Sequence, residues 1–128
     1  MFKKDLKVFA TILFWVLFTG TNIYAQETEV VEVLSVAEFK QCIDLDGVQL
    51  IDVRTPAEFA ENKIERAVNI DFLTPDFSTK LSNLRKDEAV YLYCHSGGRS
   101  DKAAKILKGL GFKKVYDLRG GIIAWMKQ

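Results

Sequence analysis

The sequence is poor in the residues that build metal sites and disulfide frameworks. Its 128 residues include two cysteines, Cys42 and Cys94, and a single histidine, His95. A zinc site needs three or four Cys, His or carboxylate ligands at usable spacings, which this set does not offer. The glycine-rich stretch after Cys94 also lacks the Gly-Lys-Ser/Thr ending of a phosphate-binding loop. We therefore expect no metal and no cofactor.

The sequence also lacks an excess of positive or negative charge. The whole chain has a net charge of +1 at pH 7, and residues 26–128 contain 15 basic and 16 acidic side chains. Nucleic acids and anionic membrane surfaces are bound by clusters of basic residues, so neither is expected as a partner. The hydrophobic content of 48% is typical of one compact domain.

Residues 1–25 have the order of a secretory signal. Three lysines precede an apolar run over 8–18, and the small residue Ala25 ends the segment. The apolar run is shorter than the ~20 residues of a membrane-spanning helix. We expect this segment to be cleaved, which leaves an exported, periplasmic domain over 26–128 that does not contact the membrane. An uncleaved N-terminal anchor is the alternative.

Short β-branched runs alternate with helical patterns along the rest of the chain. Ser35 and Glu38 form the sequence signature of a capping box, and Pro56 suits a first helical position. Strand–helix alternation with short connections predicts an α/β fold, with a parallel sheet and helices on both faces. The predicted strands are 30–34, 48–53, 67–70, 89–93 and 114–117, and the predicted helices are 35–43, one from 56, 77–84, 100–110 and one from 120.

Cys94 stands at the end of the predicted strand 89–93, the edge at which parallel sheets bind ligands. Gly97 and Gly98 allow the backbone to turn successive N–H groups toward the sulfur, and the following helix adds unpaired donors at its start. Arg99 adds positive charge. These features favour a thiolate nucleophile at Cys94. We expect His95 to border the mouth of the pocket.

Other interpretations of this loop remain open at this point. A single cysteine at a strand end is commonly a packing residue. A Cys–His dyad with His95 is a further possibility, although neighbouring residues at a sharp turn seldom face each other. A serine–histidine–acid site has no nucleophile elbow to support it.

Four groups of residues, taken together, make the sequence resemble the rhodanese family of sulfurtransferase domains. The resemblance covers essentially the whole of residues 26–128. It depends on Leu50-Ile51-Asp52-Val53-Arg54 with Pro56, Glu58 and Phe59, on Ile64 with Ala67-Val68-Asn69-Ile70, on residues 93–100, and on Gly120-Gly121 with Ala124-Trp125.

The resemblance implies a five-stranded parallel sheet and a Cys94 that carries sulfur as a persulfide. The donor would be a sulfane compound such as thiosulfate, and the acceptor a thiol or protein in the cell and cyanide in vitro. The substrate-binding residues would be those of the loop, namely His95, Ser96, Gly97, Gly98, Arg99 and Ser100. Only four residues separate Cys94 from Arg99. The related phosphatases have a wider loop, so sulfur transfer is favoured over phosphatase or arsenate reductase chemistry.

Asp52 and Arg54 match the strand-end motif of the family and are expected to support the loop. Arg54 and Glu58, four residues apart, would alternatively form a surface ion pair. Lys63 replaces the histidine of many relatives, where it either adds positive charge near the mouth or is simply solvated. Arg66 stands where many relatives have glycine, so the turn there is expected to differ.

Two further expectations concern the thiols and the mode of action. Cys42 lies in a predicted helix among apolar residues, so we expect a buried free thiol rather than a disulfide with Cys94. The domain is expected to be a monomeric enzyme. A persulfide carrier without turnover, or a redox-sensing module, is the alternative.

Overall fold

The computed structural model describes residues 28–128 of the chain. The predicted signal, residues 1–25, lies outside this range. Within residues 28–128, no helix has both the length and the apolar character needed to cross a membrane.

The five predicted strands form one fully parallel sheet, as expected. Its order is β1-β5-β4-β2-β3, so β4 and β5 occupy the centre together with β2. Every residue of β2 is buried, whereas the edge strand β3 has only two residues and is partly exposed. The strands are β1 (Val31–Leu34), β2 (Gln49–Asp52), β3 (Val68–Asn69), β4 (Val90–Tyr93) and β5 (Val115–Leu118).

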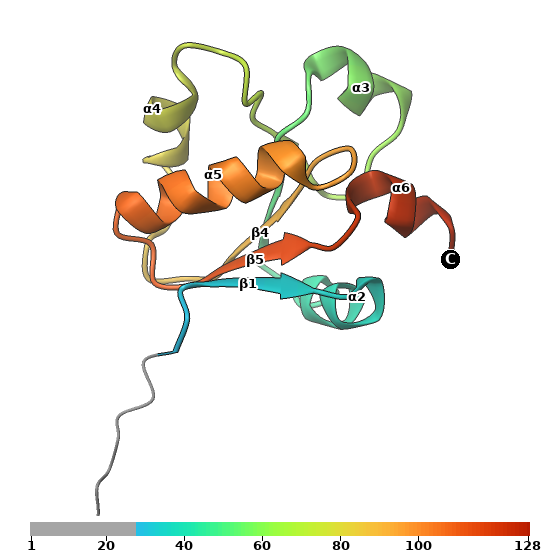
Figure 1. Cartoon of the computed structure of the whole chain (residues 1–128), viewed down its shortest axis with the longest axis horizontal. Helices are drawn as coiled ribbons and strands as arrows, with labels where there is room; N and C mark the ends of the chain where they lie inside the picture. The colour runs from blue at the N-terminus through green and yellow to red at the C-terminus, as the bar shows by residue number, and fades with distance from the viewer. Residues whose placement is uncertain (1–27) are drawn as a thin grey trace, which may run out of the picture.

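Helices cover both faces of this sheet, which confirms the predicted architecture. Figure 1 shows α5 across one face and α2 across the other, with α3 and α6 near the end to which the strand arrows point. The predicted capping box is present, because Ser35 and Glu38 bond each other's backbone N–H groups. The helices are α2 (Val36–Ile43), α3 (Pro56–Glu61), α4 (Phe77–Leu81), α5 (Gly98–Gly109) and α6 (Gly121–Met126).

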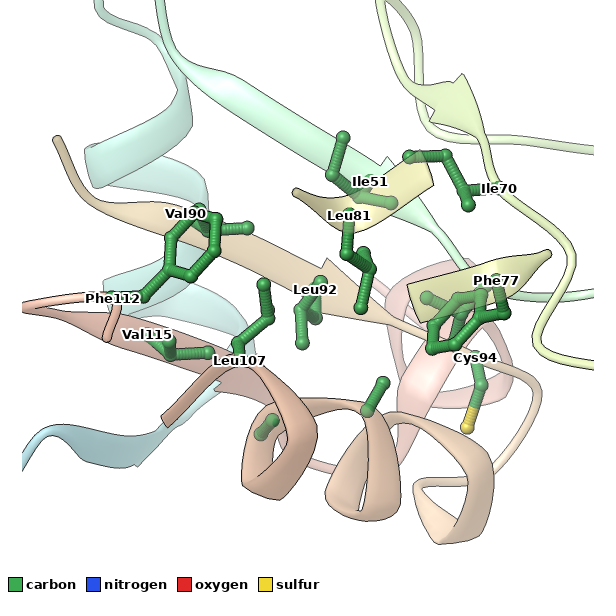
Figure 2. Close-up of a cluster of buried hydrophobic side chains, with 13 residues drawn as sticks. Ile51, Ile70, Phe77, Leu81, Val90, Leu92, Cys94, Leu107, Phe112 and Val115 are labelled. Carbon is green, nitrogen blue, oxygen red and sulfur yellow. The ribbon is translucent and has the colours of Figure 1, made fainter. Parts of the chain in front are cut away.

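Side chains alternate between two hydrophobic cores along each central strand. Val90 and Leu92 of β4 face the core beneath α4 and α5, whereas Tyr93 faces the core beneath α2 and α6. Cys94 continues the alternation and joins the first core, as Figure 2 shows. The alternation of side chains along the strand therefore places the Cys94 thiol on the face of the sheet that carries α5.

Helix α5 begins two residues earlier than predicted, at Gly98 rather than Ser100. The reason is Gly97, whose φ of +121° completes the turn from the strand and lets the chain enter the helix at once. Arg99 and Ser100 consequently lie in the first helical turn. Helix α4 is shorter than predicted, and Asp76 before it makes no side-chain cap.

Candidate active site

The Cys94 side chain lies at the carboxyl end of β4 and is almost completely covered, with 1% of its surface exposed. Its Sγ points toward the first turn of α5 in Figure 2. Cys94 also lines a cleft of about 330 Å³ together with the loop that follows it. Little of the sulfur is therefore reached by solvent, although the cleft passes beside it.

Two groups contact the sulfur directly. The backbone N–H of Gly97 donates to Sγ at 3.1 Å, and the Ser100 hydroxyl lies 3.3 Å from it. Ser100 is fully buried and also donates to the carbonyl of Gly97 at 3.2 Å. Within residues 28–128, Gly97 supplies the one backbone N–H that bonds the sulfur. The sulfur thus has one N–H donor and one neighbouring hydroxyl, rather than the successive N–H groups expected from the sequence.

Helix α6 holds the loop from its other side. The N–H of Ile122 donates to the Cys94 carbonyl at 2.9 Å, and that of Ile123 donates to the His95 carbonyl at 3.3 Å. These contacts require Gly121, because a Cβ on that residue would lie 2.5 Å from the His95 oxygen. Gly121 also has a φ of +60°, which favours glycine. The sequence indicated Gly121 as part of a helix start and of the family resemblance, without placing it against the loop of Cys94.

Arg99 forms an ion pair with Glu58 of α3. Nη1 and Nη2 of Arg99 donate to Oε1 and Oε2 of Glu58, each at 2.8 Å. The hydrogen bonds from Arg99 lower the pKa of Glu58 to about 2. Glu58 therefore pairs with Arg99 across the site and not with Arg54, so the surface pair considered from the sequence is wrong.

Arg54 instead pairs with Asp52, and both side chains are buried. Nε of Arg54 lies 3.0 Å from each Asp52 carboxylate oxygen, and Nη2 lies 2.6 Å from Oδ2. A third contact joins Nη1 to the Asn62 side chain at 3.0 Å. The pair anchors the segment after α3 to the end of β2. It does not contact the Cys94 sulfur.

Lys63 is not brought to the site. Its Nζ lies over the ring of Phe59, 4.6 Å from the centroid, and it lines neither cleft beside the loop. Arg66 has a φ of +69°, in the left-handed region that favours glycine, and its guanidinium donates to the Ile43 carbonyl at 2.7 Å.

Two clefts flank the loop, and exposed His95 lines both of them. The smaller one contains Cys94, Arg99 and Lys102. The sequence analysis missed Lys102, although its position three residues after Arg99 on a helix places both on one face. The second cleft, of about 460 Å³, is lined by Arg54, Glu58, Glu61, Asn62, His95, Ile122, Ile123, Met126 and Lys127.

Asp117 of β5 is a buried carboxyl group beneath the loop. It is 4% exposed, and its Oδ1 has no hydrogen-bond partner. Burial raises its pKa to about 6, against the opposing effect of the Ser100 hydroxyl. The sequence predicted a strand here and gave no sign that Asp117 approaches Ser100, because this contact joins two separate elements.

The two cysteines are both free thiols, as predicted. Cys42 is partly exposed rather than buried, which corrects the expectation from the sequence. Among residues 28–128, no group of three or more His, Cys, Asp or Glu side chains is placed to hold a metal ion.

Comparison with known proteins places this geometry in a family. The model of the rhodanese-like domain matches residues 35–128. A sulfurtransferase of Allochromatium vinosum is 42% identical over 85 residues, which are 66% of this chain and 77% of that protein. Thiosulfate sulfurtransferase 16 of Arabidopsis thaliana is 34% identical over 113 residues, covering 80% of this chain and 93% of the relative.

The solved structures agree with the sequence relatives. The crystal structure of a rhodanese-related protein from Thermoplasma volcanium superposes with a TM-score of 0.66 at 27% identity, over 75% of this chain and 91% of that one. The family match spans β2 to β5 and the loop after β4. The chain therefore belongs to the rhodanese-like sulfurtransferase family.

Proposed function

We propose that this protein transfers sulfane sulfur through a persulfide on Cys94. The observation that carries the proposal is the environment of one atom, the Cys94 Sγ. It lies at the carboxyl end of a central strand, accepts the Gly97 N–H and faces the start of α5. A helix start and an amide donor both stabilise negative charge on sulfur.

The reaction is a pair of displacements at sulfur. The Cys94 thiolate attacks the outer sulfur of a donor such as thiosulfate, the donor's S–S bond breaks, and sulfite leaves with the bonding electrons. An acceptor thiolate then attacks the outer sulfur of the persulfide. The Cys94 thiolate leaves with the electrons of that bond, so the protein returns to its starting form.

The same loop is a poor site for phosphate or arsenate chemistry. Tetrahedral oxyanions are commonly bound by a bidentate arginine, and the guanidinium of Arg99 is already bound on both of its terminal nitrogens by Glu58. The short spacing from Cys94 to Arg99 also favours a single sulfur atom as the transferred group.

Intact mass spectrometry tests the proposal. After incubation with thiosulfate or another sulfane donor, the protein should gain one sulfur atom, which a thiol reductant removes. Cys94→Ser should gain none, whereas Cys42→Ser should gain one as the wild type does. Absence of the mass gain with every donor tried would end the proposal.

A second candidate is a carrier that loads sulfur once and does not turn over. The near-complete burial of Cys94 favours it, because a bulky acceptor cannot reach a side chain that is 1% exposed without movement of the loop. Steady-state turnover with several thiol acceptors separates the two. A protein that loads but never cycles is a carrier or a redox-sensing module.

We also propose that the domain is exported and acts as a monomer. The support is the basic and apolar order of residues 1–25 and the balanced charge of residues 26–128. N-terminal sequencing of the protein recovered from the periplasm of a bacterial host tests cleavage after Ala25. Light scattering measures the oligomeric state.

A further inference from the structure

The main cation beside the candidate nucleophile is already neutralised by a carboxylate. Arg99 lines the cleft that contains Cys94, and it is close enough to the sulfur for the two charges to interact. Both terminal nitrogens of Arg99 nevertheless donate to Glu58. An incoming anion therefore meets an ion pair with no net charge rather than a free guanidinium.

The rest of the cleft offers little positive charge in compensation. Lys102 lines it and is exposed, and no ion-pair partner of Lys102 lies among residues 28–128. Glu58 stays ionised at neutral pH because the hydrogen bonds from Arg99 lower its pKa to about 2. The cleft thus presents one unpaired lysine, one ion pair and the thiolate itself.

Sulfane donors differ in charge. Thiosulfate carries two negative charges, whereas a small-molecule persulfide or a thiosulfonate anion carries one. Binding the doubly charged donor through Arg99 requires that the guanidinium first lose its two contacts with Glu58. Binding it elsewhere brings two charges close to the Glu58 carboxylate, which repels them.

We propose that Glu58 sets the donor preference of the site by holding Arg99 in an ion pair, which disfavours doubly charged donors relative to singly charged ones. This inference rests on the proposed role of Cys94 as the sulfur acceptor. It names the class of donor that suits the site, namely a sulfane sulfur compound with one negative charge.

The test compares two donors that differ by a single charge and give the same product. Thiosulfate reacts with the Cys94 thiolate to give the persulfide and sulfite. The methanethiosulfonate anion has a methyl group in place of one charged oxygen, and it gives the persulfide and methanesulfinate. In each case the donor's S–S bond breaks, one S–S bond to Cys94 forms, and the leaving group keeps the bonding electrons.

The measured quantity is the second-order rate constant for persulfide formation, followed by intact mass, and its ratio between the two donors. Glu58→Gln keeps the shape of the side chain and removes its charge. We expect the ratio of thiosulfate to methanethiosulfonate to rise roughly five- to tenfold, as for the loss of one nearby charge at a partly exposed site.

Glu61→Gln is the matched control. Glu61 belongs to the same helix, is exposed and lines the neighbouring cleft, but it does not contact Arg99. It therefore reports the screened, long-range effect of losing one negative charge. The donor ratio of Glu61→Gln should stay near that of the wild type.

Each outcome decides between the inferences. If wild-type protein takes up sulfur from neither donor, the proposed function itself fails. If it loads sulfur but Glu58→Gln changes both donors equally, or lowers the ratio, Glu58 only orients Arg99 and this inference alone is wrong. Should Glu58→Gln fail to fold, Glu58→Asp pulls the carboxylate back from Arg99, and the ratio should move in the same direction by a smaller factor.

Discussion

The backbone of Gly121 lies against the carbonyl groups of Cys94 and His95. A Cβ at Gly121 would be 2.6 Å from the Cys94 oxygen and 2.5 Å from the His95 oxygen. Both oxygens are also hydrogen-bonded by the next residues of α6. The loop that carries the thiol therefore packs so closely against Gly121 that no side chain fits there. The geometry of the loop thus depends on a residue distant in sequence.

Gly121→Ala should damage both stability and sulfur loading. The added methyl group forces the loop away from α6, and the positive φ of Gly121 adds strain, so we expect a loss of about 2 kcal/mol or more in the free energy of unfolding. Urea denaturation and the rate of persulfide formation measure the two effects. Gly109→Ala is the control, because nothing lies within 4 Å of its added Cβ. This helical position should gain about 0.5–1 kcal/mol.

Asp117→Asn should change how stability depends on pH. Burial raises the pKa of Asp117 in the folded protein to about 6, from the 3.8 of an exposed aspartate. A raised acid pKa means that stability is greatest below the unfolded value and falls as pH rises through the folded value. Asn does not ionise, so the variant does not lose stability in this way. The free energy of unfolding of the variant, relative to that of the wild type, should therefore increase between pH 4 and pH 7 by on the order of 2 kcal/mol. Thermal or urea unfolding across this range measures it, and a constant difference would show that Asp117 does not titrate there.

Arg54→Met should be strongly destabilising. It leaves the fully buried carboxylate of Asp52 without its partner, a change that typically costs about 3–5 kcal/mol. Arg85→Met provides the comparison, because Arg85 and Glu88 form a pair in which each side chain is about half exposed. That pair should be worth less than ~1 kcal/mol. Equal losses in the two variants, measured by urea denaturation, would mean that the buried pair contributes no more than a surface one.

Alkylation should distinguish the thiols by the size of the reagent. Cys94 lines a cleft but is only 1% exposed, so the small reagent iodoacetamide should label it and a polymer-linked maleimide should not. Labelling of Cys94→Ser reports Cys42 alone. Under denaturing, non-reducing conditions both thiols should react, because both are free in the structure. Rapid labelling of native Cys94 by the bulky reagent would show that the loop opens widely.

The architecture could be predicted because its signals are local. Strands such as β4 are short runs of apolar and aromatic residues, and Ser35 with Glu38 marks a helix start within four residues. The start of α5 was placed two residues late, since nothing local tells at which glycine the turn ends. The positive φ of Gly97 marks that point, and the sequence alone does not tell which of the two glycines adopts it.

The candidate site was predictable only where it is continuous in sequence. Cys94 and the loop to Ser100 follow one another, so their proximity needs no tertiary knowledge. Glu58, Asp117 and Gly121 come from α3, β5 and α6, and they reach the loop only because the parallel sheet brings these elements to one edge. In the sequence, each of these three residues is equally compatible with an ordinary surface, strand or turn position, so none of them could be assigned to the site in advance.

The dependence of the loop on α6 has a consequence for truncated chains. Gly121 follows Cys94 by 27 residues, so a chain cut between the two keeps the thiol but lacks the helix that fixes its backbone. Such a chain also lacks the N–H donors of Ile122 and Ile123 to the Cys94 and His95 carbonyls. A C-terminal truncation before Gly121 should therefore retain the Cys94 thiol and lose sulfur loading.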